Sequence, residues 1–329
     1  MQTRRTVLGA LVAAPVLGTR LARADTQTIR IAVQPGMTYL ALNVMQHRSL
    51  LEKHAPGMKA EFVRLAAGNN VNDAVLSGAV DVGATGVPAF LLMWAKTRGS
   101  ANVMAIAPFN NMPLVLITRN PALHSVSDIG PNDRIALPGV GVSSQSIMLR
   151  MEAARLYGDA NFQKFEPLEV NRGHPDAMAA LLGNTEIDCH FTTAPYLQRE
   201  LAVPGIHAIL SSSDVYGGPG TIGVLFAMKK FRDANPALMA AFIAATEEAM
   251  AVIKNDHRGA AEAYLAVSGD KASREEVEKV LADPSTVFDI APRGTMKVAE
   301  FMHRTGSIKV MPENWQAMFV PELAGKAGS

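Results

Sequence analysis

Short apolar runs alternate with longer segments of helical periodicity along this chain. Residues 28–33 (TIRIAV) form an apolar run that ends at a Gln-Pro-Gly turn, and residues 38–54 then carry apolar side chains at helical spacing. The next segments predict a strand over 60–65, a helix over 70–79 and a strand over 80–84. This alternation predicts a parallel sheet with crossover helices.

A second set of the same units follows a long apolar run at residues 111–119, which predicts a strand leaving the first set. The later pattern predicts strands over 134–137, 165–170 and 187–192, and helices over 145–157 and 175–182. A Gly-rich turn, PGVGVSS, precedes the first of these helices. The chain is therefore expected to build two α/β lobes, each with its own sheet.

The chain is expected to return to the first lobe after the flexible run VYGGPG at residues 215–220, through a strand over 222–228. Asn235 and Pro236 begin a helix that runs to about residue 254, and the remainder is helical. We therefore expect an α/β protein whose two lobes are joined by a two-segment hinge with a ligand cleft between them. The expected boundaries are 25–112 for the first part of lobe 1, 113–217 for lobe 2 and 218–329 for the return to lobe 1.

The first 24 residues have the pattern of a cleavable export signal, with a charged start, a short apolar stretch and a small-residue end at Ala24. The apolar stretch is too short for a membrane span, which needs roughly 20 mostly apolar residues. Arg4 and Arg5 resemble the pair in twin-arginine signals. We expect a protein exported to a periplasm and not itself spanning the membrane.

Charge and cysteine content narrow the classes of partner and chemistry. Loss of residues 1–24 removes four of the 31 Lys and Arg residues and none of the 30 acidic residues, which leaves a net charge near −3 and no basic footprint for nucleic acid. Cys189 is the single cysteine, so an internal disulfide is excluded and no lipid-modified cysteine stands near the signal. Cys189 is predicted to be a buried structural residue, because neighbours in a strand, such as His190, point to opposite faces.

Four runs carry a resemblance to a known family: IRIAVQPG, LAAGNNVNDAVLSGAVDVGATGVPAF, HPDAMAALLGNTEIDCHFTTAPY and FMHRTGSIKVMPENWQAMF. In order and spacing they resemble the periplasmic binding proteins of nitrate, sulfonate, taurine and thiamine-precursor ABC transporters. The resemblance covers nearly the whole mature chain. It implies a type II periplasmic-binding fold, no catalysis, no cofactor, a small-molecule ligand, a membrane permease as partner and a monomeric protein.

The resemblance places ligand contacts in the loops at the strand ends, where open α/β sheets bind their ligands. The implied residues are Gln34, Gly36, Met37, Asn69, Thr85, Gly86, Val142, Ser143, Ser144, Gln145, Thr192 and Thr193. Ser143 and Ser144 have the strongest physical argument, because a helix N-terminus with free amides favours an anion. A simple N-cap explains one serine equally well, and Asn69 also fits a cap of the next helix.

Two features bear on the ligand. Sulfonate-type relatives often carry an aromatic and an acidic residue where this chain has Thr193 and Ala194, so a taurine-like zwitterion is disfavoured. No Arg or Lys falls inside the candidate loops, and we expect Arg172 and His174 to lie solvent-exposed at a loop edge. A small organic anion such as a sulfonate would then be held mainly by amides and hydroxyls.

Three alternatives remain open at the level of the sequence. Tyr39 and Tyr216 lie near the first turn and the return crossover, where either could stack on a pyrimidine or an aromatic acid, although core packing is the commoner role of a tyrosine. The resembled group also includes enzymes of thiamine-pyrimidine synthesis, but these use a cysteine-rich run that this chain lacks. A ligand-sensing module of a membrane receptor would use the same pocket without a transporter.

Overall fold

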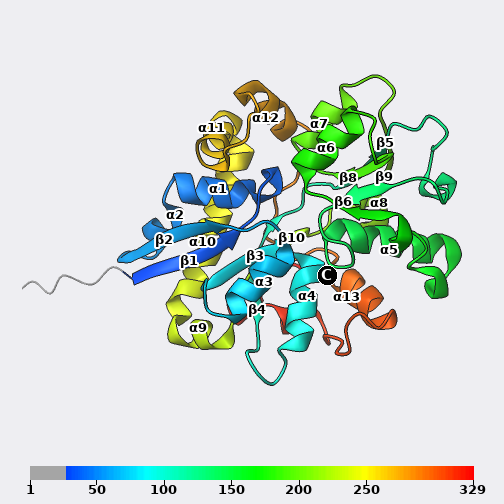
Figure 1. Ribbon diagram of the computed structural model, residues 1–329. Helices are drawn as coiled ribbons and strands as arrows, with labels where there is room; N and C mark the ends of the chain where they lie inside the picture. Colours follow the sequence, from blue (N-terminus) through cyan, green and yellow to red (C-terminus); the bar gives the residue numbers. More distant parts are fainter. Residues whose placement is uncertain (1–26) are drawn as a thin grey trace, which may run out of the picture.

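Figure 1 shows the computed structural model, which describes residues 27–329 as two α/β lobes side by side. The predicted export signal, with Arg4 and Arg5, lies outside the described residues. The chain passes from lobe 1 to lobe 2 after residue 110 and returns before residue 223. The two-lobed α/β architecture predicted from the alternating pattern is therefore confirmed.

Lobe 1 contains a five-stranded sheet of order β2-β1-β3-β10-β4. Strand β1 is parallel to β2 and β3, whereas β10 runs antiparallel to both β3 and β4. The strands are β1 (Gln27–Val33), β2 (Met58–Arg64), β3 (Val82–Gly86), β4 (Met104–Asn110) and β10 (Gly223–Ala227). The returning strand thus sits inside the sheet, between two strands laid down before the chain enters lobe 2.

Lobe 2 repeats this arrangement with the order β7-β6-β8-β5-β9. Strand β6 is parallel to β7 and β8, and β5 is antiparallel to β8 and β9. The strands are β5 (Val115–Thr118), β6 (Ile135–Leu137), β7 (Glu169–Asn171), β8 (Cys189–Thr192) and β9 (His207–Ser211). The strand predicted over 165–170 is wrong in its first half, where Pro167 lies in a 3-10 segment because proline has no N–H for a ladder.

Helices cover both faces of each sheet (Figure 1). Lobe 1 has α1 (Leu40–His47), α2 (Leu50–His54), α3 (Gly68–Leu76), α4 (Val87–Lys96), α9 (Lys229–Ala234), α10 (Pro236–Asn255), α11 (His257–Ser268), α12 (Arg274–Leu281) and α13 (Thr295–Arg304). Lobe 2 has α5 (Ser144–Tyr157), α6 (His174–Leu182), α7 (Tyr196–Leu201) and α8 (Ser212–Tyr216). The single helix predicted over 38–54 is broken at Ser49, whose φ of 50° is left-handed.

Short 3-10 segments complete the described chain: η1 (Met37–Tyr39), η2 (Val126–Asp128), η3 (Asp159–Asn161), η4 (Glu166–Leu168), η5 (Trp315–Met318) and η6 (Pro321–Leu323). The last two belong to a C-terminal segment that returns to the lobe 1 sheet. The N–H of Val320 donates to the carbonyl of Ala105 at 2.8 Å. This contact holds the end of the chain against strand β4.

Helix α10 is the one helix among the described residues that is long and apolar enough to cross a membrane by length and composition. Its side chains Phe242, Ala245 and Ala249 are fully buried, and the helix packs on α1, α2 and β4. It is therefore the core helix of lobe 1. Cys189 is also fully buried, as predicted, and burial raises the pKa of its thiol to about 12.

Candidate functional site

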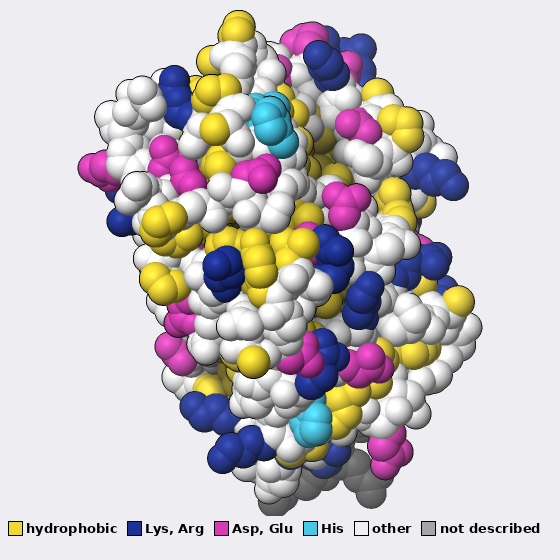
Figure 2. All heavy atoms as spheres, turned by 90° about the vertical axis from the view of Figure 1, so that its right-hand side faces the viewer, with side chains coloured by type: hydrophobic (Ala, Val, Ile, Leu, Met, Phe, Trp, Pro, Cys, Tyr) yellow, Lys and Arg dark blue, Asp and Glu magenta, His cyan; other side chains and the backbone are white. Residues whose placement is uncertain are grey.

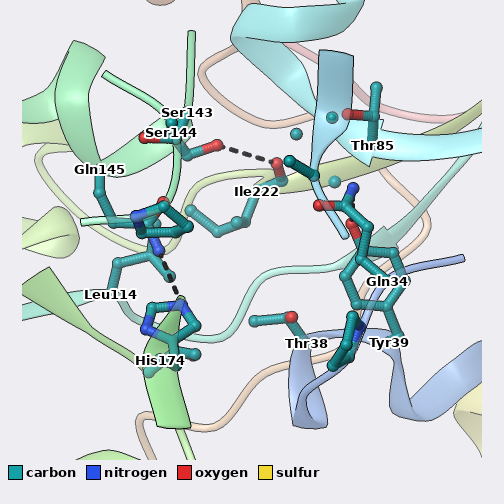
Figure 3. Close-up of a pocket in the computed structure, with 18 of the residues that line it drawn as sticks. Gln34, Thr38, Tyr39, Thr85, Leu114, Ser143, Ser144, Gln145, His174 and Ile222 are labelled. Carbon is teal, nitrogen blue, oxygen red and sulfur yellow. Dashed lines mark hydrogen bonds between the residues drawn. The ribbon is translucent and has the colours of Figure 1, made fainter. Parts of the chain in front are cut away.

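A cavity of about 170 Å³ lies between the two lobes (Figure 3). Its walls include the segments at the ends of β1, β2 and β3 in lobe 1 and of β6, β7 and β8 in lobe 2, which is where open α/β sheets bind ligands. Pockets for drug-sized ligands have roughly 300–1,000 Å³. This cavity therefore favours a small ligand.

The cavity brings together many of the residues implied by the sequence. Those that line it are Gln34, Thr85, Gly86, Val142, Ser143, Ser144, Gln145 and Thr193. In Figure 3, Gln34 and Thr85 lie on one side and Ser143, Ser144 and Gln145 on the other. Both lobes therefore contribute to one site.

Tyr216 does not line this cavity, contrary to the expectation that it could stack on a ligand. Its hydroxyl donates to the carbonyl of Thr221 at 3.0 Å. A Cβ added at Gly220 or Gly294 would come within 2.6 Å of its ring, so both glycines leave room for the tyrosine. Tyr216 is therefore a packing residue beside the return crossover.

Gly36, Met37, Asn69 and Thr192 are also absent from the cavity wall. Met37 and Thr192 are fully buried, whereas Asn69 is exposed on the first turn of α3. Gly36 has a φ of 112° and allows the turn between β1 and η1. The N–H of Met37 donates across the lobes to the carbonyl of Ala194 at 3.4 Å. Gly36 and Met37 thus shape the turn after β1, whereas Thr192 ends strand β8 and Asn69 faces solvent.

His174 was expected to be solvent-exposed, and this expectation is wrong. It is half-buried at the start of α6, lines the cavity and stacks on Tyr196 with ring centroids 5.6 Å apart. Its place directly before Pro175, at the N-terminus of a predicted helix, is the signal that could have identified it. Other lining residues that sequence reasoning did not select include Thr38, Phe109, Asn110, Leu114, Tyr196 and Ile222.

Four helices begin at the cavity. The N-cap residues of α3, α4, α5 and α6 all line it, and they are Ala67, Gly86, Ser143 and Gly173. Only the N-cap of α5 is a side-chain cap, because the Ser143 hydroxyl accepts from the N–H of Ser146 at 3.2 Å. The positive ends of four helix dipoles therefore point toward one small space, which favours a negative charge there.

Three buried hydrogen-bond donors in the wall have no partner among the described residues. They are the hydroxyls of Thr85 and Thr193 and the amide nitrogen of Asn110, and each of the three residues is at most 1% exposed. The carbonyl oxygen of Asn110 accepts from the N–H of Met112 at 2.6 Å, which orients the amide and leaves its NH₂ group free. Buried polar groups are normally hydrogen-bonded, so these three groups are suited to donate to a bound ligand.

The lobe 1 wall is held by a polar contact backed by aromatic rings. The side-chain amide of Gln34 donates to the Tyr39 hydroxyl at 2.5 Å and to the carbonyl of Ala84 at 3.3 Å. The Tyr39 ring lies 5.1 Å from that of Phe109. Burial raises the pKa of Tyr39, so its phenol stays neutral. The wall therefore offers an apolar surface with donors at its edge.

The two lobes contact each other at the cavity and elsewhere along their interface. The Ser144 hydroxyl donates to the carbonyl of Ile222 at 3.4 Å, and a Cβ added at Gly86 would lie 2.7 Å from the Ser144 oxygen. Two ion pairs also join the lobes: Arg199 to Asp270 at 2.9 Å and Arg304 to Asp159 at 2.5 Å. Both lobes thus line the cavity and are joined by direct contacts.

The NMT1-like family model matches residues 22–267 of this chain. The chain belongs to the NMT1-like family. It is 24% identical over 234 residues to a protein of Escherichia coli (strain K12) that bears the name aliphatic sulfonates-binding protein, covering 71% of this chain and 69% of that protein. The family resemblance inferred from the four sequence runs is therefore confirmed.

Solved structures show the fold of this NMT1-like chain. It superposes on the periplasmic aliphatic sulphonate binding protein SsuA from Escherichia coli with a TM-score of 0.68 at 19% identity, covering 90% of this chain and 92% of the other. The nitrate-binding protein NrtA from Synechocystis gives a TM-score of 0.68 at 12% identity, with 92% and 86% covered. The type II periplasmic-binding fold is confirmed.

The surface and the remaining chemistry of this NMT1-like protein are unremarkable. On the face shown in Figure 2, Lys and Arg are interspersed with Asp and Glu, so no broad basic area is present on that face. Within residues 27–329 no group of His, Cys, Asp and Glu side chains is arranged to hold a metal ion. The cavity is thus the feature of the described chain that best supports a function.

Proposed function

We propose that this chain is the substrate-binding component of an ABC importer and that it holds a small organic anion, such as a sulfonate, between its lobes. One observation carries the proposal: four helix N-termini line the cavity together with three buried donors that have no partner within residues 27–329. Such a site offers donors to an acceptor-rich group. The names of the sulfonate-binding relatives support the same class of ligand.

The remainder of the wall suits the organic part of such a ligand. Phe109, Leu114 and Ile222 present apolar surface, and Tyr39 and Tyr196 present rings from opposite lobes. The rings also favour a second candidate, a flat ligand such as an aromatic acid or a pyrimidine. An aromatic acid would satisfy the same donors with its carboxylate, whereas a neutral pyrimidine would not use the helix dipoles.

The proposed mechanism is closure of the lobes about the two crossing segments. An open form binds the anion on one lobe, and rotation brings Ser144 and Gly86 together. The closed surface is then presented to a membrane permease by a monomeric protein, with no catalysis. In this proposal the moving units are residues 113–217 and the two segments 25–112 and 218–329.

A thermal-shift screen of the mature protein tests the proposal. Alkanesulfonates, arylsulfonates, taurine, nitrate, aromatic acids and thiamine-pathway pyrimidines are the compounds to compare. A true ligand raises the free energy of unfolding by about 2.7 kcal/mol at a hundredfold excess over its Kd. We expect a shift with sulfonates that lack an amino group and none with taurine, which carries one. A shift with pyrimidines alone, or turnover of a compound, would contradict the anion proposal.

We also propose that residues 1–24 direct export to the periplasm by the twin-arginine route, because Arg4 and Arg5 form the paired arginines typical of such a signal. Mass spectrometry of the periplasmic fraction should find a chain that begins at Asp25. The variant Arg4→Lys, Arg5→Lys should accumulate as uncleaved precursor, because the paired arginines identify the signal to this pathway. Normal export of that variant would indicate the general secretory route instead.

A further inference from the structure

A buried chain of three ionisable side chains runs from the interior of lobe 2 to the cavity. Glu200 Oε1 lies 2.6 Å from His190 Nδ1, and His190 Nε2 lies 2.9 Å from His174 Nδ1. Glu200 and His190 are fully buried, and His174 reaches the cavity wall, where its Nε2 lies 3.3 Å from Gln145 Nε2 (Figure 3). The chain connects a hidden carboxyl group to the site.

The proton positions along this chain are linked. A neutral imidazole has one N–H donor and one bare nitrogen acceptor. When Glu200 is ionised, His190 donates to it and His174 donates to His190, so His174 Nε2 faces the cavity as an acceptor. In that state Nε2 accepts from the side-chain NH₂ group of Gln145, 3.3 Å away. When one proton is added at Glu200 and both rings change tautomer, His174 Nε2 carries an N–H, loses the hydrogen bond from Gln145 and can donate to a ligand acceptor in the cavity.

The charges of the cavity make this difference important for an anion. No Lys, Arg, Asp or Glu lines the cavity in the part of the chain that the structure describes, and His174 is its one basic side chain. A bound anion and an ionised Glu200 would be two negative charges separated by the His190 and His174 rings, and their repulsion is strong where water is excluded. Adding one proton to the Glu200–His190–His174 chain neutralises Glu200 and lets His174 donate a hydrogen bond.

We propose that the anion binds together with one proton, which the Glu200–His190–His174 chain holds and which lets His174 Nε2 donate to the ligand. The inference rests on the proposed function and defines its ligand further, as an acceptor-bearing anion that is recognised with a proton. The proton comes from solvent when the free protein has Glu200 ionised. When Glu200 is already protonated, binding takes up none.

The burial of Glu200, His190 and His174 determines the pH range in which binding takes up a proton. Burial raises the pKa of Glu200 to about 8 and outweighs a hydrogen bond from the Thr192 side chain, which lowers it. Burial lowers the pKa of His190 to about 3 and also lowers that of His174, so neither ring is charged near neutral pH. Proton uptake on binding is therefore expected above about pH 8 and not below it.

The helices and strands that surround these three residues also carry other titratable groups. Helix α7 adds Tyr196, whose pKa is raised by burial, and Arg199, which pairs with Asp270. Strand β8 adds the buried thiol of Cys189, and α6 itself carries Asp176. Strand β6 and the neighbouring Gln145 on α5 contribute no titratable group. None of these replaces the three-residue chain as a carrier of a proton to the cavity.

Isothermal titration calorimetry of the mature protein tests the inference, with ethanesulfonate and benzenesulfonate as probes. Sulfonates remain ionised over the whole range, so any proton exchanged belongs to the protein. Titrations at about pH 6.5 and about pH 9, each in two buffers of different ionisation enthalpy, give the number of protons taken up. We expect about none at the lower pH and about one at the higher, with Kd rising about tenfold per pH unit above about 8.

The variant Glu200→Gln keeps the size of the side chain and removes its titration. It should bind the same sulfonate with no proton uptake at either pH and with a flat pH profile. Uptake that persists in this variant would place the proton elsewhere and overturn the inference. Should the variant not fold, the proton count of the natural protein alone decides the question.

The outcomes separate the two proposals. Tight sulfonate binding by the natural protein with no proton uptake at about pH 9 would overturn the proton-coupled inference and leave the proposed function intact. Absence of binding of every anion at every pH would overturn the proposed function and, with it, the inference.

Discussion

The substitution Gly86→Val is expected to weaken ligand binding about 100-fold while the protein stays folded. A Cβ at position 86 would lie 2.7 Å from the Ser144 oxygen of the opposite lobe, and the added methyl groups of valine extend further into that contact. Overpacking of this kind costs about 1–3 kcal/mol or more, and about 2.8 kcal/mol corresponds to a 100-fold loss. Titration calorimetry with the ligand selected in the screen measures the effect.

A graded series identifies lobe closure as the cause. Gly86→Ala should have a smaller effect, because the Ser144 hydroxyl can rotate away from a single methyl group. Gly325→Val is the matched control, since a Cβ there meets no atom within 4 Å. Small-angle scattering should show Gly86→Val in an extended form even with ligand present. Natural affinity in this variant would show that the lobes do not approach each other at Gly86 when they bind.

The double substitution Thr85→Val, Thr193→Val should stabilise the free protein and weaken binding by about 100-fold. Each hydroxyl is buried without a partner among the described residues, and an unpaired buried polar group costs about 1–3 kcal/mol. Valine has the same shape and removes that cost. Hydrogen bonds to a charged group contribute about 1.5–3 kcal/mol each, so an anion that uses both hydroxyls loses that contribution. Chemical denaturation and titration calorimetry give the two values.

Thr118→Val is the matched control for this pair. The Thr118 hydroxyl is also fully buried, but it donates to the carbonyl of Asp188 at 3.0 Å and accepts from the N–H of Asn120 at 3.0 Å. Its loss should destabilise the protein and leave the affinity unchanged. An unchanged affinity in the double variant at Thr85 and Thr193 would mean that these hydroxyls do not contact the ligand.

Local sequence signals were sufficient for most of the fold, and their failures have physical reasons. Strands such as β1 and β6 are short apolar runs bounded by turn residues, which the pattern identifies. Helix α4 escaped notice because its sequence, VPAFLLMWAK, is apolar almost all round and has no polar face to reveal its period. Strand β4 contains Pro108, which normally argues against an interior strand, yet it pairs with Val224 beside a register shift.

The sequence predicted the site residues that lie at strand ends. It missed those whose position depends on contacts between segments far apart in sequence. Ser143 and Ser144 come after strand β6, and Thr85 lies at the end of β3, so the general rule for α/β sheets selected them. Asn110 ends a strand that the pattern did not predict. Tyr216 lies near the crossover in sequence, but its ring packs against Gly294, which lies 78 residues further along the sequence and has no Cβ to block it. No local pattern contains that information.

The position of β10 inside the lobe 1 sheet also determines the order in which the protein can be assembled. Residues 223–227 pair with both β3 and β4, so the first sheet remains split until the ribosome has made all of lobe 2. Lobe 2 is built from one uninterrupted stretch and depends mainly on contacts nearer in sequence. The second lobe can therefore form while the first still exposes two unsatisfied strand edges, which are open to aggregation until β10 arrives.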